Sequence, residues 1–131
     1  MVDPAKDLTI LEDRPLTDRE LEFVRWCLEH GLPGSDAYIP QLDRLRVISR
    51  CGCGCASIDF SFDRVAPDYT TGLQEVSDHL WGTSGTDLCG VFVFVRNEKL
   101  AGLEVWSVDG QITPTELPNV EVLRSYSEST P

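Results

Sequence analysis

The feature that most constrains the fold of this chain is a run of five β-branched or aromatic residues, Val91 to Val95. Such residues suit a pleated and packed surface. Because side chains alternate along a strand, the valines point one way, and Phe92 and Phe94 point the other. A run that is apolar toward both faces is typical of an interior strand that is covered on both. The sequence therefore predicts a central strand here.

A second strand is expected to return beside the first. Asn97 lies in a polar segment and tolerates positive φ, which favours a chain reversal. We therefore predict a hairpin with strands near 90–97 and 100–108. Alternation in the second strand brings Glu104 and Trp106 to one face.

Two helices are predicted before the sheet. Thr17 and Glu20 form a capping box, and apolar residues recur at helical spacing over 21–28. A short second helix is expected to begin at about Ile39, because Pro40 fits only near the start of a helix.

Residues 55–62 alternate cleanly, with Asp59 and Ser61 on the polar side. The fold class we predict is α+β, with two N-terminal helices packed on one face of an antiparallel sheet of about four strands. The expected strands lie near 46–51, 55–62, 90–97 and 100–108.

Residues 1–131 are expected to form a single domain, with a flexible arm over 1–15 and a frayed tail over 125–131. The segment 64–86 is punctuated by proline and glycine. It is predicted to hold either a further strand or a long ordered loop, and long loops often carry function.

The chain is strongly acidic, with 22 acidic and 11 basic residues and a net charge of −11. Such a charge repels phosphate backbones and anionic lipids, so nucleic acid and membranes are not expected partners. A cationic protein or a metal ion would be attracted. No export leader or span of roughly 20 apolar residues is evident. Five cysteines without an export signal favour reduced thiols and a cytoplasmic location.

The cysteines Cys51, Cys53 and Cys55 are separated by single glycines, and two geometries are open. The stretch either reverses with Cys53 at its tip or runs extended with all thiols on one side. Zinc usually takes four ligands, and Cys89 or His79 could supply the fourth. Paired zinc ligands usually have about two to four residues between them, so small packed thiols at a bend are the competing interpretation. We therefore predict no cofactor, with zinc as the alternative. A redox pair is less favoured, because the usual dithiol has two intervening residues.

The expected exposed sheet face carries Asp59, Ser61, Glu104 and Trp106, which we predict as binding residues rather than catalytic ones. The sequence contains no phosphate-binding loop, zinc-protease helix or nucleophile elbow.

The strand with Cys53-Gly54-Cys55, followed by Ile58-Asp59-Phe60, and the later segment Leu100–Trp106 together resemble a group of small acidic bacterial proteins of uncharacterised function. The resemblance covers roughly residues 17–123 and implies a bacterial, cytosolic single domain. It implies no activity, cofactor or catalytic residue.

Three functional hypotheses follow. The first is a non-catalytic acidic module that binds a protein partner or itself, as an immunity protein or antitoxin would. The second is a small metal-binding protein that uses Cys51, Cys53, Cys55 and Cys89. The third is an enzyme in which segment 64–86 covers Asp59 and Glu104.

Overall fold

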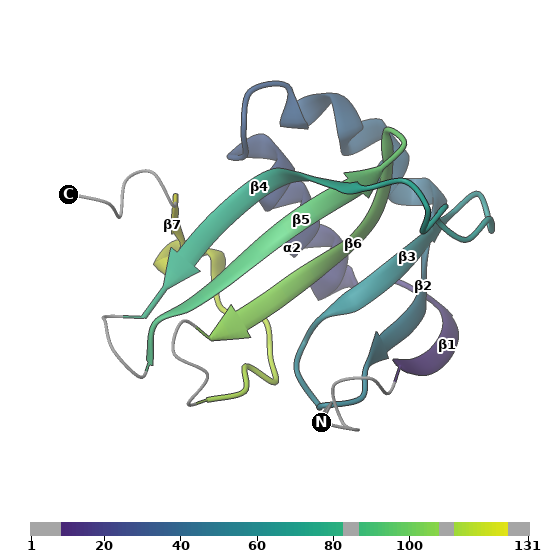
Figure 1. Ribbon diagram of the computed structural model, residues 1–131. Helices are drawn as coiled ribbons and strands as arrows, with labels where there is room; N and C mark the ends of the chain where they lie inside the picture. The colour runs from purple at the N-terminus through teal and green to yellow at the C-terminus, as the bar shows by residue number, and fades with distance from the viewer. Residues whose placement is uncertain (1–8, 83–86, 108–111, 126–131) are drawn as a thin grey trace.

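The structure is a computed structural model that describes residues 9–82, 87–107 and 112–125 (Figure 1). Within these ranges the chain forms two 3₁₀ helices, η1 and η3, one α-helix and seven strands. In chain order the elements are β1 (Thr9–Pro15), α2 (Asp18–Glu29), η1 (Ser35–Arg44), β2 (Leu45–Cys51), β3 (Ile58–Phe62), β4 (Leu73–Trp81), β5 (Cys89–Arg96), β6 (Lys99–Ser107), η3 (Val120–Val122) and β7 (Arg124–Ser125).

The strands form one antiparallel sheet in the order β1-β2-β3-β6-β5-β4-β7. The general α+β class is confirmed, but the predicted count of about four strands is wrong. The four predicted strands correspond to β2, β3, β5 and β6. The sheet also contains β1 from the predicted arm, β4 from segment 64–86 and the short β7 at the predicted tail.

The sequence leaves segment 64–86 open between a further strand and a long ordered loop, and the structure adopts the strand β4. The ambiguity arises because the core-facing positions of β4 are not a regular apolar series. A register shift between Glu75 and Ser77 interrupts its pairing with β5. Val76, Ser77, His79 and Leu80 are the buried residues of β4, so two of its four buried positions are polar. The Ser77 hydroxyl accepts a hydrogen bond from the Val93 amide, which offsets the cost of burying it.

The predicted hairpin is confirmed at the centre of the sheet. Strand β5 pairs with β4 on one side and β6 on the other. The chain reverses at Asn97 and Glu98, where φ is 52° and 63°. Val91, Val93 and Val95 are fully buried toward the helices, as their alternation requires.

Helix α2 begins with the predicted capping box: Thr17 accepts from the Glu20 amide, and the Glu20 carboxylate accepts from the Thr17 amide. Its buried face, Phe23, Val24, Cys27 and Leu28, belongs to the same core as the three β5 valines. Figure 1 shows α2 crossing behind the sheet. We call the opposite side of the sheet the open face.

The second predicted helix is the 3₁₀ helix η1, and it starts at Ser35 rather than near Ile39. Gly34 precedes it with a φ of 88°, and the Ser35 hydroxyl donates to the Leu28 carbonyl over 2.6 Å. This buried contact lies at the earlier start, and Pro40 falls inside the element. Among the described residues, no helix has the length and apolar character needed to cross a bilayer.

Candidate functional site

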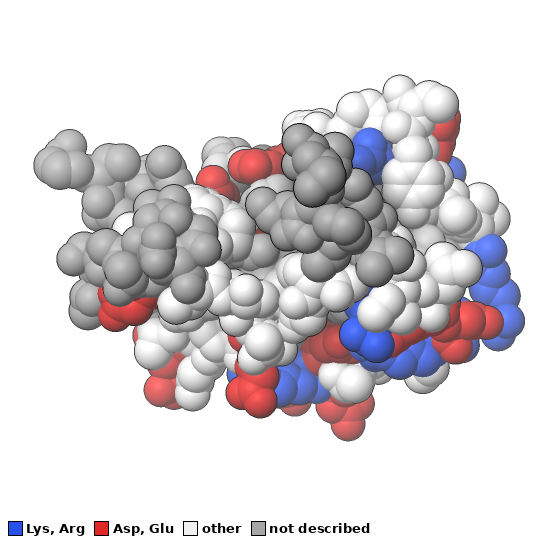
Figure 2. All heavy atoms as spheres, turned by 60° about the horizontal axis from the view of Figure 1, so that its bottom comes forward, with Lys and Arg blue, Asp and Glu red and all other residues white. Residues whose placement is uncertain are grey.

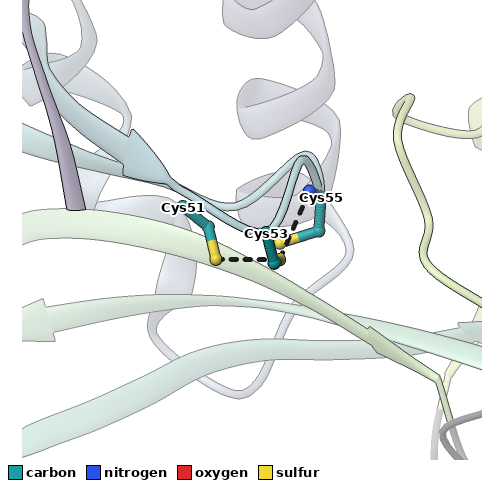
Figure 3. Close-up of side chains that lie close together, drawn as sticks. All are labelled: Cys51, Cys53 and Cys55. Carbon is teal, nitrogen blue, oxygen red and sulfur yellow. Dashed lines mark hydrogen bonds between the residues drawn. The ribbon is translucent and has the colours of Figure 1, made fainter. Parts of the chain in front are cut away.

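The loop between β2 and β3 gathers three cysteines into one cluster. Its base is closed by a hydrogen bond from the Cys51 amide to the Ser57 carbonyl, 3.2 Å long. Above it, the Gly54 amide donates to the Cys51 carbonyl, and Gly54 adopts a φ of 91°. A side chain at that position would be strained, so this glycine enables the tight reversal. Of the two geometries left open by the sequence, the structure adopts the reversal, with Cys53 exposed (Figure 3).

The three sulfur atoms lie within 4.8 Å of one another, and Figure 3 shows them on one side of the loop. Cys51 Sγ and Cys53 Sγ are 2.9 Å apart. The Cys55 amide donates to Cys53 Sγ over 3.4 Å. Zinc–sulfur bonds of about 2.3 Å in a tetrahedral site separate the sulfurs by about 3.8 Å. Cys51 Sγ and Cys53 Sγ are closer than this, so binding one metal ion would require these two sulfurs to separate by about 0.9 Å. We call Cys51, Cys53 and Cys55 the cysteine triad.

Contact between the thiols gives the members of the triad different acidities. Burial, together with the hydrogen bond to Cys53, raises the pKa of Cys51 to about 12. The same contact lowers the pKa of the Cys53 thiol, because a proton shared between the two sulfurs stabilises a thiolate at Cys53.

The two predicted candidates for a fourth ligand do not join the triad. Cys89 begins β5 and is 1% exposed. His79 on β4 is 2% exposed and packs beside the Trp26 ring, with the ring centroids 5.0 Å apart. Among the described residues, the group of ligand atoms at metal-binding distance contains the triad and no other side chain. The structure thus brings together three of the four cysteines predicted as metal ligands.

A groove of about 800 Å³ connects the triad to the open face. Three of the four predicted binding residues, Asp59, Glu104 and Trp106, line it together with the cysteines. Ser61, the fourth, is 3% exposed and is not part of the lining. The remaining lining residues are Thr9, Arg50, Ser57, Ile58, Leu103, Val105, Ser107, Ile112, Thr113 and Pro114. Two sets of residues predicted as separate sites therefore share one groove.

The groove is acidic. Glu104 is exposed on β6, but partial desolvation beside the groove raises its pKa, and the nearby charge of Asp59 raises it further. Burial also raises the pKa of Asp59, against the opposing effects of a 3.0 Å hydrogen bond from Ser49 and the charge of Arg96. The pKa values of both carboxyl groups are thus raised above their ordinary values, and a cation entering the groove would favour their ionised forms.

The one basic side chain among the described lining residues is already engaged. Arg50 Nε donates to Glu12 Oε1 over 2.8 Å, in an ion pair between β2 and β1. Arg46 pairs likewise with Asp13. Figure 2 shows acidic and basic side chains standing side by side along one edge of the molecule. The carboxylates of Asp59 and Glu104 therefore dominate the charge of the groove.

The described part of segment 64–86, residues 64–82, contributes no side chain to the groove lining, and residues 73–81 belong to the sheet as β4. Tyr69 of this segment nevertheless lies near Asp59, and burial together with the charge of Asp59 raises the pKa of the tyrosine. Ahead of β4, Arg96 donates to the Thr71 carbonyl over 2.6 Å and lies 5.5 Å from the centre of the Tyr69 ring. The segment is thus anchored to the β5 end of the hairpin.

Residues 112–114 form a groove wall that sequence reasoning missed. The Pro114 carbonyl accepts a hydrogen bond from the Ala56 amide over 2.8 Å, which ties this segment to the cysteine loop. No spacing or residue type in the segment signals that role, because the contact joins positions far apart in the chain. Ser57 was also missed; its hydroxyl accepts from the Val105 amide and positions the loop against β6.

Comparison of the chain with protein-family models, with curated proteins and with solved structures finds no match.

Proposed function

We propose that this protein binds a thiophilic metal ion of the zinc class through Cys51, Cys53 and Cys55. The observation that supports this most strongly is the gathering of three sulfur atoms within 4.8 Å of one another in a five-residue stretch at the end of β2 and in the loop that follows. Thiolate sulfur selects zinc, copper(I) and iron–sulfur chemistry over magnesium or calcium. A divalent ion also neutralises the repulsion that three adjacent thiolates would otherwise suffer.

A site of three protein ligands differs from a closed structural zinc site. Structural zinc usually has four protein ligands, whereas sites that bind exchangeable molecules keep one position open. The triad borders the groove, so the remaining coordination position is available to water or to a ligand there. Exposure of Cys53 makes the ion exchangeable with solvent, which suits metal binding or transfer better than a fold-stabilising role.

Elemental analysis of protein purified without chelator tests this proposal. We expect one equivalent of metal in the wild type and none in Cys53→Ser. Cys89→Ala is the matched control, because it removes a cysteine outside the triad and should retain the metal. Far-ultraviolet circular dichroism establishes that each variant is folded. Absence of metal from a folded wild type that has been offered zinc would reject the proposal.

A second function is favoured by the carboxylates and the indole in the groove. We propose that Asp59, Glu104 and Trp106 bind a cationic partner, such as a basic segment of another protein, which the net charge of −11 would also attract. A partner recovered by the wild type but lost with the pair Asp59→Asn/Glu104→Gln would support it. Failure to recover any partner, together with a strictly monomeric profile, would count against it.

A further inference from the structure

When no metal is bound, the contact between Cys51 and Cys53 also places the two thiols close to disulfide-bonding distance. Their sulfurs are 2.9 Å apart, and a disulfide bond is about 2.05 Å long. Closing the bond requires a movement of only about 1 Å. The Cys55 amide donates to Cys53 Sγ and holds that sulfur toward Cys51. Cys27 and Cys89 are buried elsewhere in the described structure.

We propose that the metal-free protein exchanges thiols with small cationic disulfides that enter the acidic groove, with Cys53 as the attacking residue and Cys51 as the closing one. This activity goes beyond metal binding and does not require it. A metal ion on the triad would block it, since the same sulfurs would be occupied.

The reaction balances with a small disulfide as the oxidant. The Cys53 thiolate attacks one sulfur of the disulfide, so a protein–ligand mixed disulfide forms and the first small thiolate leaves. Cys51 then loses its proton and attacks Cys53 Sγ. The Cys51–Cys53 bond forms, the mixed disulfide breaks and the second small thiolate leaves. Two protein thiols are oxidised and one disulfide is reduced to two thiols.

Exposure assigns the two roles. Cys53 is the exposed member of the pair and meets a ligand arriving from solvent, whereas Cys51 is partly covered at the end of β2. Both line the groove, so a disulfide bound there lies next to the attacking sulfur. The groove volume of about 800 Å³ is within the usual range for small-molecule sites.

The negative charge of the groove favours positively charged disulfides as substrates. Asp59 and Glu104 line the same cavity as the two sulfurs, and the nearby Arg50 is paired with Glu12. A disulfide that carries ammonium groups would be concentrated there, and one that carries carboxylates would be repelled. Cationic disulfides should therefore react faster than neutral ones, and anionic disulfides should react slowest.

The test compares three probes on the chelator-treated full chain: cystamine, which is cationic; 2-hydroxyethyl disulfide, which is neutral; and oxidised glutathione, which is anionic. Each rate is divided by the rate of 2-mercaptoethanol with the same probe, which removes differences in intrinsic reactivity. We expect the normalised rate with cystamine to exceed that with oxidised glutathione by about ten-fold at low salt. The ratio should fall in high salt and in Asp59→Asn/Glu104→Gln. Equal normalised rates would overturn the substrate assignment.

Two single substitutions test the roles of the sulfurs. Cys51→Ser should accumulate a mixed disulfide on Cys53, detected by peptide mapping, whereas the wild type should proceed to the internal Cys51–Cys53 bond. Cys53→Ser should react no faster than 2-mercaptoethanol. Clearance of the adduct by Cys51→Ser at the wild-type rate, or first labelling of Cys51 or Cys55, would overturn the assignment. Because the protein is stripped of metal, this result is independent of the metal analysis above.

Discussion

Trp106 packs against the bare backbone of Gly90 on the neighbouring strand, where a β-carbon would lie 2.4 Å from two carbons of the indole ring. Glycine at position 90 is thus what allows Trp106 to lie over β5 while also lining the groove. The pair links the central hairpin to the candidate site.

Gly90→Ala is therefore expected to displace the indole and to destabilise the protein by about 1–3 kcal/mol, the usual effect of overpacking. Tryptophan fluorescence and urea unfolding measure the two effects. Gly72→Ala is the control, because no atom lies within 4 Å of the β-carbon that it adds. Equal behaviour of the two variants would mean that the contact does not constrain Trp106.

Glu20 links the start of α2 to β1 and should contribute to stability at neutral pH. Arg14 donates to both of its carboxylate oxygens, over 2.8 and 3.1 Å. Burial raises the pKa of Glu20, but the hydrogen bonds from Arg14 and Thr17 outweigh burial and lower it. A carboxylate whose pKa is lowered on folding stabilises the fold above its unfolded pKa and loses that effect as pH falls through the folded value.

Glu20→Gln should accordingly lose about 1 kcal/mol of stability at pH 7. The difference from the wild type should shrink below the ordinary glutamate pKa of 4.5. Urea unfolding across pH measures this. Glu22→Gln, at an exposed position of the same helix, should change little. A deficit that persists undiminished in acid would show that the effect is not electrostatic.

Ionisation of Asp78 on the open face should destabilise the fold, whereas ionisation of Glu20 stabilises it. Its Oδ1 is buried without a hydrogen-bond partner among the described residues. Burial, with the nearby charge of Glu75, raises its pKa to about 6. Between the ordinary value of 3.8 and about 6 the folded state binds more protons than the unfolded state, so stability falls as pH rises through this window.

Asp78→Asn should remove the loss of stability that accompanies ionisation of Asp78. Stability at pH 7 should therefore rise by an amount on the order of 1 kcal/mol, after allowance for solvent screening. The gain should vanish below pH 3.8, where both states are protonated in the wild type. Thermal unfolding at several pH values follows it. Asp43→Asn, at an exposed position, is the control. Destabilisation at pH 7 would contradict the expected cost of this charge.

The parts of the fold that could be predicted are those fixed by neighbours in sequence. The apolar ribbon of β5, the reversal at Asn97 and the capping box of Thr17 and Glu20 all depend on local preferences. Strand β4 depends instead on burying Ser77 and His79 around a register shift, and tertiary contacts alone make that favourable.

Strand β1 likewise depends on contacts between residues that are far apart in the chain. Ion pairs from Glu12 and Asp13 to arginines on β2 join positions more than 30 residues apart. The same distinction applies to the candidate site. The glycine spacing of the cysteine triad is a local feature of the sequence, but the position of the triad beside Asp59 and Glu104 depends on the register of β3 against β6. No sequence pattern predicts that register, because the side chains of both strands alternate in the same way.

Titration of the chelator-treated protein with cobalt(II), followed by its sulfur-to-metal charge-transfer absorption, tests most directly whether the triad binds metal. The absorption reports metal–thiolate bonds rather than adventitious ions on surface carboxylates. It should saturate at one equivalent in the wild type and in Cys89→Ala, and should be lost in Cys53→Ser. No charge-transfer band in the wild type, or a band that survives intact in Cys53→Ser, would contradict metal binding by Cys51, Cys53 and Cys55.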